Sequence, residues 1–189
     1  MSIITDYGLD SPSRAYLVLA LSIEDRKGRK SADILHIQKI IRYLEYLKEK
    51  KEIDYSNFKL GQVSYELEEN LRTLQESGLV TNVGTNFQLT AEGQQAAVEL
   101  NRSTAADDLR KLSFAKQQLN GLDRDELLFF MYKLIPESQV NSTEAPRLMK
   151  RSRELVEALY RKEIISAAMA AKWLEVSEST FLTSIAGKR

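Results

Sequence analysis

Apolar residues recur at helical spacing along most of this chain, and few helix-breaking residues interrupt them. From Ile37 to Leu47, apolar residues stand at positions i, i+3, i+4, i+7 and i+10. This spacing places the side chains on one face of a helix, where they can pack against a core. Because the 189 residues include only three prolines and eight glycines, the sequence predicts a mainly α fold.

Capping residues set the expected ends of several helices. Ser11 and Pro12 suit the N-cap and first position of one helix, and Asp123 with Glu126 forms a capping-box pattern before another. Gly78 stands where a helix should stop. The expected helices span about 12–23, 31–51, 64–78, 90–100, 109–121, 123–135 and 147–162, and a final pair follows them.

Strand signals are confined to one place. Residues 79–81 and 86–89 flank the turn sequence Asn82-Val83-Gly84-Thr85. Two short strands around such a turn predict a hairpin, after which Thr90 caps the next helix.

Composition restricts the chemistry available to the chain. The 27 basic and 27 acidic residues give a net charge of zero, which argues against a globally basic surface for non-specific nucleic-acid binding. The absence of cysteine and the presence of one histidine, His36, exclude disulfides, Cys/His zinc sites and thiol nucleophiles. We therefore expect no enzyme activity, metal or cofactor, and we assign His36 no role.

The apolar segment Ala15–Ile23 is about half the length that a membrane-spanning helix needs. The residues before it include Asp6 and Asp10 and lack the positive region of a secretory signal. We expect a cytoplasmic protein without membrane contact.

Three helices followed by a two-stranded hairpin is the element order of a winged helix, here expected over residues 1–100. The segment LQESGLVTNVGTNFQLTAEG, from Leu74 to Gly93, resembles the corresponding part of winged-helix regulators of the MarR and PadR kind. The resemblance implies that fold and a DNA-binding function. The helix expected to enter the major groove carries Glu66, Glu68 and Glu69 against Arg72, so protein contact or scaffolding remain alternatives for this unit.

A second resemblance covers the N-terminal two thirds of the chain. The segments HIQKIIRYLEYL (36–47), FKLGQVSYELEENLRTLQESGLV (58–80) and LDRDELLFFMYKLIPE (122–137) are similar to Panacea (SocA-like) antitoxin domains. That family has a Gly-Pro-x-Ser element where this chain has Gly61-Gln62-Val63-Ser64, so the proline is absent here.

The C-terminal segment AKWLEVSESTF, from Ala171 to Phe181, resembles the centre of a helix-turn-helix unit. In this interpretation Ala171 allows close helix approach, Leu174 and Val176 close the core, Ser177 caps the second helix, and Phe181 anchors it. Glu175 takes the turn position where glycine is common because φ is often positive. The longer segment 154–185 also looks like small antitoxins partnered with PIN-type ribonuclease toxins.

The polar segment PESQVNSTEAP (136–146), bracketed by prolines, is the best candidate for a linker. The expected organisation is thus a winged-helix domain over 1–100, a connecting helical pair over 101–135, a linker over 136–146 and a C-terminal helix-turn-helix over 147–189. From Ala145 onward nine basic residues stand against five acidic ones, whereas the preceding residues have the opposite balance, 18 against 22.

We therefore expect a dimeric, sequence-specific regulator that binds double-stranded DNA through its C-terminal unit. Leu182 and Ile185 are too apolar for a groove-facing surface and should pack on Trp173 or on another subunit. The expected DNA contacts are Arg147, Lys150, Arg151, Arg153, Ser177, Glu178, Ser179, Thr180, Thr183, Lys188 and Arg189.

Two alternatives stand beside this interpretation. The four basic residues of 147–153 can equally be a solvated helix face. The chain as a whole can be an antitoxin-like interaction module that binds a toxin protein through apolar C-terminal helices, without independent DNA binding.

Overall fold

The computed structural model describes residues 3–187, and 63% of the chain is helical. The predicted mainly α class is therefore confirmed. Two compact units form: unit 1 comprises residues 1–56 and 63–121, and unit 2 comprises residues 57–62 and 122–189. Within residues 3–187 no helix is both long and apolar enough to cross a membrane.

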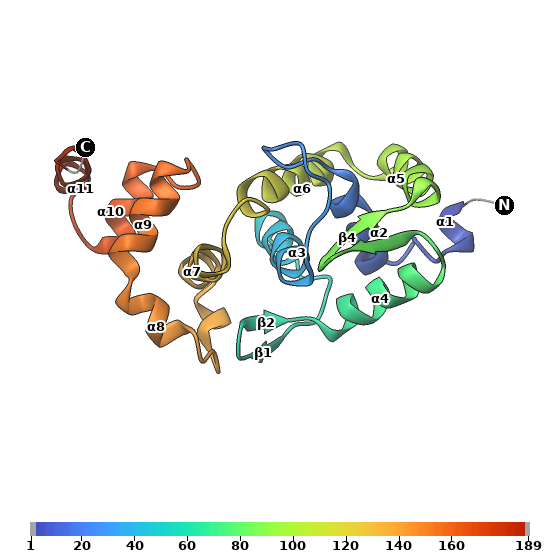
Figure 1. The fold of residues 1–189 in the computed structure, drawn as a ribbon, viewed down its shortest axis with the longest axis horizontal. Helices are drawn as coiled ribbons and strands as arrows, with labels where there is room; N and C mark the ends of the chain where they lie inside the picture. Colours follow the sequence, from blue (N-terminus) through green and yellow to red (C-terminus); the bar gives the residue numbers. More distant parts are fainter. Residues whose placement is uncertain (1–2, 188–189) are drawn as a thin grey trace. The chain divides into compact units, whose positions relative to one another are not determined.

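Unit 1 is built around α2, whose residues from Tyr16 to Leu21 are all buried. This helix packs against α3, α4, α5 and α6 (Figure 1). The unbroken apolar run explains its central place, because a helix that is apolar on all sides is buried on all sides. The helices of unit 1 are α1 (Ile3–Asp6), α2 (Pro12–Ser22), α3 (Ile34–Lys48), α4 (Tyr65–Glu76), α5 (Ala91–Ser103) and α6 (Ala106–Leu119).

The predicted hairpin is present as β3 (Val80–Val83) and β4 (Asn86–Leu89), which pair antiparallel with Val80 opposite Leu89. Gly84 in the turn has φ of 62°, a conformation that glycine adopts at little cost. Ala32, in the segment between α2 and α3, adds a single antiparallel bridge to Phe87 through two backbone hydrogen bonds of 2.9 and 3.2 Å.

Unit 2 is organised around α7 (Arg124–Leu134), whose residues 126–132 are all buried. It packs against α8 and α9 and against the 3-10 turn η1. The other elements are η1 (Pro136–Gln139), α8 (Ala145–Lys150), α9 (Ser152–Arg161), α10 (Ala167–Leu174) and α11 (Glu178–Ala186). A second hairpin, β1 (Ser56–Phe58) and β2 (Gly61–Val63), was not expected from the sequence, and its residues 57–62 belong to unit 2.

The segment 136–146 does not behave as a linker. It contains η1 and the buried Ser138, and Ser142 accepts or donates a 2.6 Å hydrogen bond with Tyr132. The Ser142 hydroxyl also donates to the backbone carbonyl of Lys59 at 3.0 Å. Its polar residues are therefore used in local hydrogen bonds, and the two units divide at Gly121 instead, within the expected pair of connecting helices.

The helix expected over 147–162 is two helices. α8 ends at Lys150 and α9 begins at Ser152, with Arg151 between them at φ −98° and ψ 15°. Ser152 donates its hydroxyl to the carbonyl of Met149 at 2.5 Å, a bond that competes with regular helix pairing.

Gly93 in α5 yields a prediction, because an added Cβ would lie 2.1 Å from the carbonyl oxygen of Leu79. In an open helix, Gly→Ala stabilises by about 1 kcal/mol. Here we expect Gly93→Ala to lower the free energy of unfolding by about 2 kcal/mol, because backbone would have to move. Urea unfolding measures the change, with the exposed Gln95→Ala on the same helix as control. A Gly93→Ala protein as stable as wild type would contradict the packing.

Candidate nucleic-acid interface

α10 and α11 are joined by the three-residue turn 175–177. Glu175 adopts the left-handed conformation, with φ 57° and ψ 39°, as its position in the sequence predicted. Ser177 caps α11 and accepts a 3.1 Å hydrogen bond from the backbone N–H of Thr180. Both turn predictions are therefore confirmed, and the turn joins the left-handed C-cap of α10 to the serine N-cap of α11.

α11 is held by one aromatic side chain. Phe181 is 1% exposed, and its ring meets the ring of Tyr160 on α9 edge-on, with centroids 5.1 Å apart. Its predicted role as the anchor is confirmed. Edge-to-face contact adds to the burial of apolar area, so this pair fixes α11 against α9.

α10 is held by Trp173, which packs edge-on against Phe129 and Phe130 of α7 at centroid distances of 6.1 and 5.9 Å. Ala171 is buried, as predicted for close helix approach. Val176, in contrast, is 41% exposed and does not close the core, so that expectation was wrong. Trp173 and Phe181 fill the role that the sequence interpretation gave to Val176.

The outward face of α11 carries short polar side chains. Glu178, Ser179, Thr180 and Thr183 are exposed, and Leu182 lies among them with 41% exposure. Some hydroxyls are used locally: Ser177 bonds to Thr180 at 2.7 Å, and Thr183 donates to the carbonyl of Ser179 at 2.9 Å. Leu182 is therefore not covered by Trp173. Lys188 and Arg189 lie outside the described residues.

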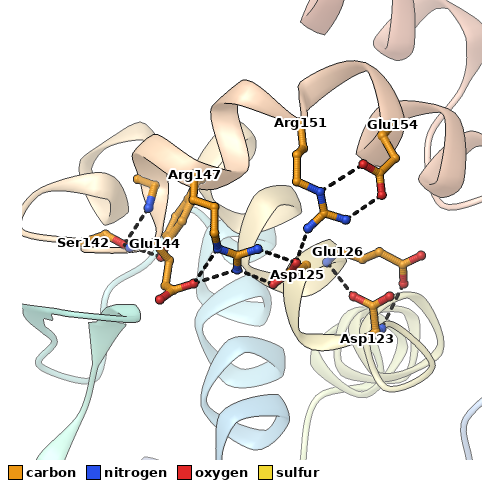
Figure 2. A network of polar contacts seen from close by, with 10 residues as sticks. Asp123, Asp125, Glu126, Ser142, Glu144, Arg147, Arg151 and Glu154 are labelled. Carbon is orange, nitrogen blue, oxygen red and sulfur yellow. Dashed lines mark hydrogen bonds and ion pairs between the residues drawn. The ribbon is translucent and has the colours of Figure 1, made fainter.

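Arg147 is engaged by carboxylates (Figure 2). Two of its nitrogens donate to the two oxygens of Asp125 at 2.8 and 2.6 Å, and it also donates to Glu144 at 2.7 Å. Parallel donation from a guanidinium to a carboxylate is a strong and geometrically specific ion pair.

Arg151 joins the same network. It donates to Asp125 and, at 3.0 and 2.5 Å, to both oxygens of Glu154. Hydrogen bonds from Arg147 and then Arg151 lower the pKa of the Asp125 carboxyl to about 2. The network thus contains two guanidinium groups and three carboxylates, so the charge of both arginines is balanced within it.

The N-terminus of α7 carries this network. Asp123 and Glu126 form the predicted capping box, with both hydrogen bonds at 2.9 Å. Glu126 is 4% exposed and accepts a 2.5 Å hydrogen bond from Lys162 at the end of α9. Carboxylates at the start of α7 therefore bind α8 and both ends of α9, which gives the basic segment a structural role.

The remaining predicted cations differ from one another. Arg153 donates to Glu157 on the same helix at 3.3 Å. Lys150 is exposed and has no ion-pair partner among the residues described. The sequence interpretation did not predict that Asp125 and Glu126 pair with cations of the basic segment, because both lie well before it in the chain. The pairs with Glu144 and Glu154 could have been predicted, since each stands three residues from its arginine.

In unit 1, α4 is acidic on its exposed surface. Glu66, Glu68 and Glu69 are exposed, and Arg72 pairs with Glu69 at 3.0 Å. Residues 80–89 of the hairpin contain no lysine or arginine. The exposed surface of α4 therefore carries more carboxylates than guanidinium groups, which is unfavourable for contact with phosphates.

Glu175 yields a second prediction. A non-glycine residue in the left-handed region costs about 1–2 kcal/mol. We expect Glu175→Gly to raise the free energy of unfolding by about 1 kcal/mol, since glycine loses more chain entropy on folding but avoids this strain. Glu178→Gly makes the same substitution at the start of α11 and should be destabilising. The changes in the free energy of unfolding of the two variants, measured with urea, should therefore have opposite signs. Equal signs for the two variants would contradict the strain at residue 175.

Asp125 yields a third prediction. Its pKa in the folded protein, about 2, is below the ordinary value of 3.8, so its stabilising effect is complete above about pH 4 and disappears as the pH falls toward 2. We expect Asp125→Asn to cost about 1–2 kcal/mol at neutral pH and to flatten the loss of stability in that range. Urea unfolding at several pH values measures both effects. The exposed Glu175→Gln is the control, and a wild-type acid response in Asp125→Asn would disprove the assignment.

Neither the family models nor the curated proteins nor the solved structures that were compared with this chain gave a match. Among residues 3–187, no group of three or more histidine or carboxylate side chains is arranged to hold a metal ion.

Proposed function

We propose that this chain is a cytoplasmic, sequence-specific DNA-binding transcriptional regulator that acts as a homodimer. The observation that carries the proposal is the unit of α10, the three-residue turn and α11, with left-handed Glu175, the Ser177 cap and buried Phe181. A short turn between two helices, the second of which presents a polar face, is typical of helix-turn-helix readers.

In this proposal α11 lies in the major groove. Glu178 can accept a hydrogen bond from cytosine N4, and the hydroxyls of Ser179, Thr180 and Thr183 can pair with several bases. Such hydroxyls discriminate weakly. A dimer on a two-fold site doubles the number of contacts, and for this reason we propose a dimer.

For unit 1 we propose a winged-helix arrangement used for dimerisation or for contact with a partner. The order of α2, α3, α4, β3 and β4 supports it, as does the bridge from Ala32 to Phe87, which joins the segment between α2 and α3 to β4. The acidic surface of α4 favours protein over DNA as its partner.

A second candidate is an antitoxin-like module that binds a protein, such as a toxin, instead of DNA. The observation in its favour is exposed apolar surface. Val176 in the turn and Leu182 on the outward face of α11 are each 41% exposed. Exposed apolar side chains that belong to one patch favour a protein interface, and both residues belong to the segment of the turn and α11.

Selection of duplexes from a random-sequence library tests the DNA proposal. We expect enrichment of a two-fold sequence, and we expect Ser179→Ala with Thr183→Ala to reduce the preference for it roughly tenfold. Ser184→Ala is the matched control, because its hydroxyl faces inward and donates to the carbonyl of Phe181. An enriched sequence that the double variant binds as well as wild type would show that α11 is not the reader.

The protein-binding candidate predicts a different outcome. The chain would ignore duplex DNA even at low salt and would co-purify with the product of the adjacent gene. Leu182→Asp would then abolish that association without unfolding the chain, because the residue is exposed. Retention of the partner by Leu182→Asp would exclude α11 as the contact.

A further inference from the structure

A shallow groove of about 560 Å³ lies along the outward face of α9. Its seven lining residues lie between Lys150 and Arg161 in the sequence. Four of them are basic and two are acidic. The groove belongs entirely to unit 2.

The two carboxylates of the groove are already engaged. Glu154 accepts from Arg151 at 3.0 and 2.5 Å, and Glu157 accepts from Arg153 at 3.3 Å. In each pair the carboxylate neutralises the charge of its arginine. The charge that remains is that of the other two cations in the groove.

Those two cations, Lys150 and Arg161, are exposed and have no carboxylate partner within residues 3–187. Arg147 and Arg151, in contrast, are held by Asp125. Of the charged groups around α9, Lys150 and Arg161 are therefore available to an anion without breaking an ion pair.

Arg161 also connects this groove to α11. It lines a second groove, of about 710 Å³, together with Ile165 after α9 and Ile185 of α11. Glu163 also lines this second groove, and Arg161 is its one basic residue and the residue that the two grooves share.

We propose that Lys150 and Arg161 bind the phosphodiester backbone of the same DNA duplex that α11 contacts. The proposal rests on the proposed function and replaces Arg147 and Arg151 as the phosphate contacts. Lys150 is the last residue of α8 and Arg161 the last of α9, and the ten residues of α9 span about 15 Å, so the two side chains reach separate phosphates. Both provide donors that suit phosphate oxygens, and Arg161 can do so with two parallel bonds.

Salt-dependent binding to a fluorescein-labelled, random-sequence duplex tests the proposal, because such a probe reports phosphate contacts without base reading. Each lost phosphate contact reduces the magnitude of the negative slope of log K against log salt by about 0.9. We expect Lys150→Ala with Arg161→Ala to lower the slope by about 1.8 and to weaken binding roughly tenfold at about 100 mM salt. Lys150→Arg with Arg161→Lys keeps both charges and should retain the wild-type slope.

Lys59→Ala with Arg124→Ala is the matched control. Both residues are exposed, belong to unit 2 and lie outside the two grooves, so the same charge is removed elsewhere. A control slope reduced as much as that of the test variant would overturn the proposal, because the effect would then be one of net charge. Equal urea unfolding curves for all variants show that folding is retained.

The outcomes separate this inference from the proposed function. Absence of wild-type binding at low salt overturns DNA binding itself. Salt-dependent wild-type binding with an unchanged slope in Lys150→Ala, Arg161→Ala leaves DNA binding in place and overturns the α9 contacts alone.

Discussion

The ion pairs that Asp125 makes with Arg147 and Arg151 hold together the polar side of unit 2. α7 is apolar from Leu127 to Tyr132 and is buried there, so its polar residues are concentrated at its N-terminus. One carboxylate accepting from two guanidinium groups joins that end of α7 to α8 and to the start of α9. Removing Asp125 would break the link between these elements, because Arg147 would keep only Glu144 and Arg151 only Glu154, each three residues away in the sequence.

This constraint changes where positive charge is available. In the sequence, basic residues outnumber acidic ones only from Ala145 onward, yet Asp125, Glu126 and Glu144 pair with cations of that segment. The net charge counted over a stretch of sequence therefore differs from the net charge of the surface that this stretch forms in the fold. Among the cations that line the groove along α9, the two without an ion pair within residues 3–187 are Lys150 at the end of α8 and Arg161 at the end of α9.

The features that the sequence predicted correctly are local ones. The helical periodicity of 37–47, the capping box of Asp123 and Glu126, and the left-handed turn at Glu175 each depend on residues within one or two helical turns. The hairpin of β3 and β4 belongs to the same class, since its turn sequence lies between its strands.

The features that sequence reasoning missed depend on distant residues. The proline-bracketed segment 136–146 looks like a linker because it is polar, but its hydroxyls find Tyr132 and the backbone of Lys59. Val176 has the apolar character of a core residue, yet Trp173 and Phe181 occupy the positions from which the core is filled. Neither outcome can be derived without knowing which helices meet.

The local hydrogen bonds of α11 limit how it can read a base sequence. Hydroxyls that already donate to a backbone carbonyl, as Thr183 does to Ser179, have only their acceptor capacity left for a base. Glu178 is also acceptor-only when ionised, so the outward face offers few donors to the acceptor-rich edge of guanine. An α11 reader would therefore contact adenine N6 or cytosine N4, and every base pair presents one such amino group in the major groove. Its affinity would depend on phosphate contacts from α9 and on repetition of the site by two-fold symmetry, because base contacts of this kind discriminate weakly by themselves.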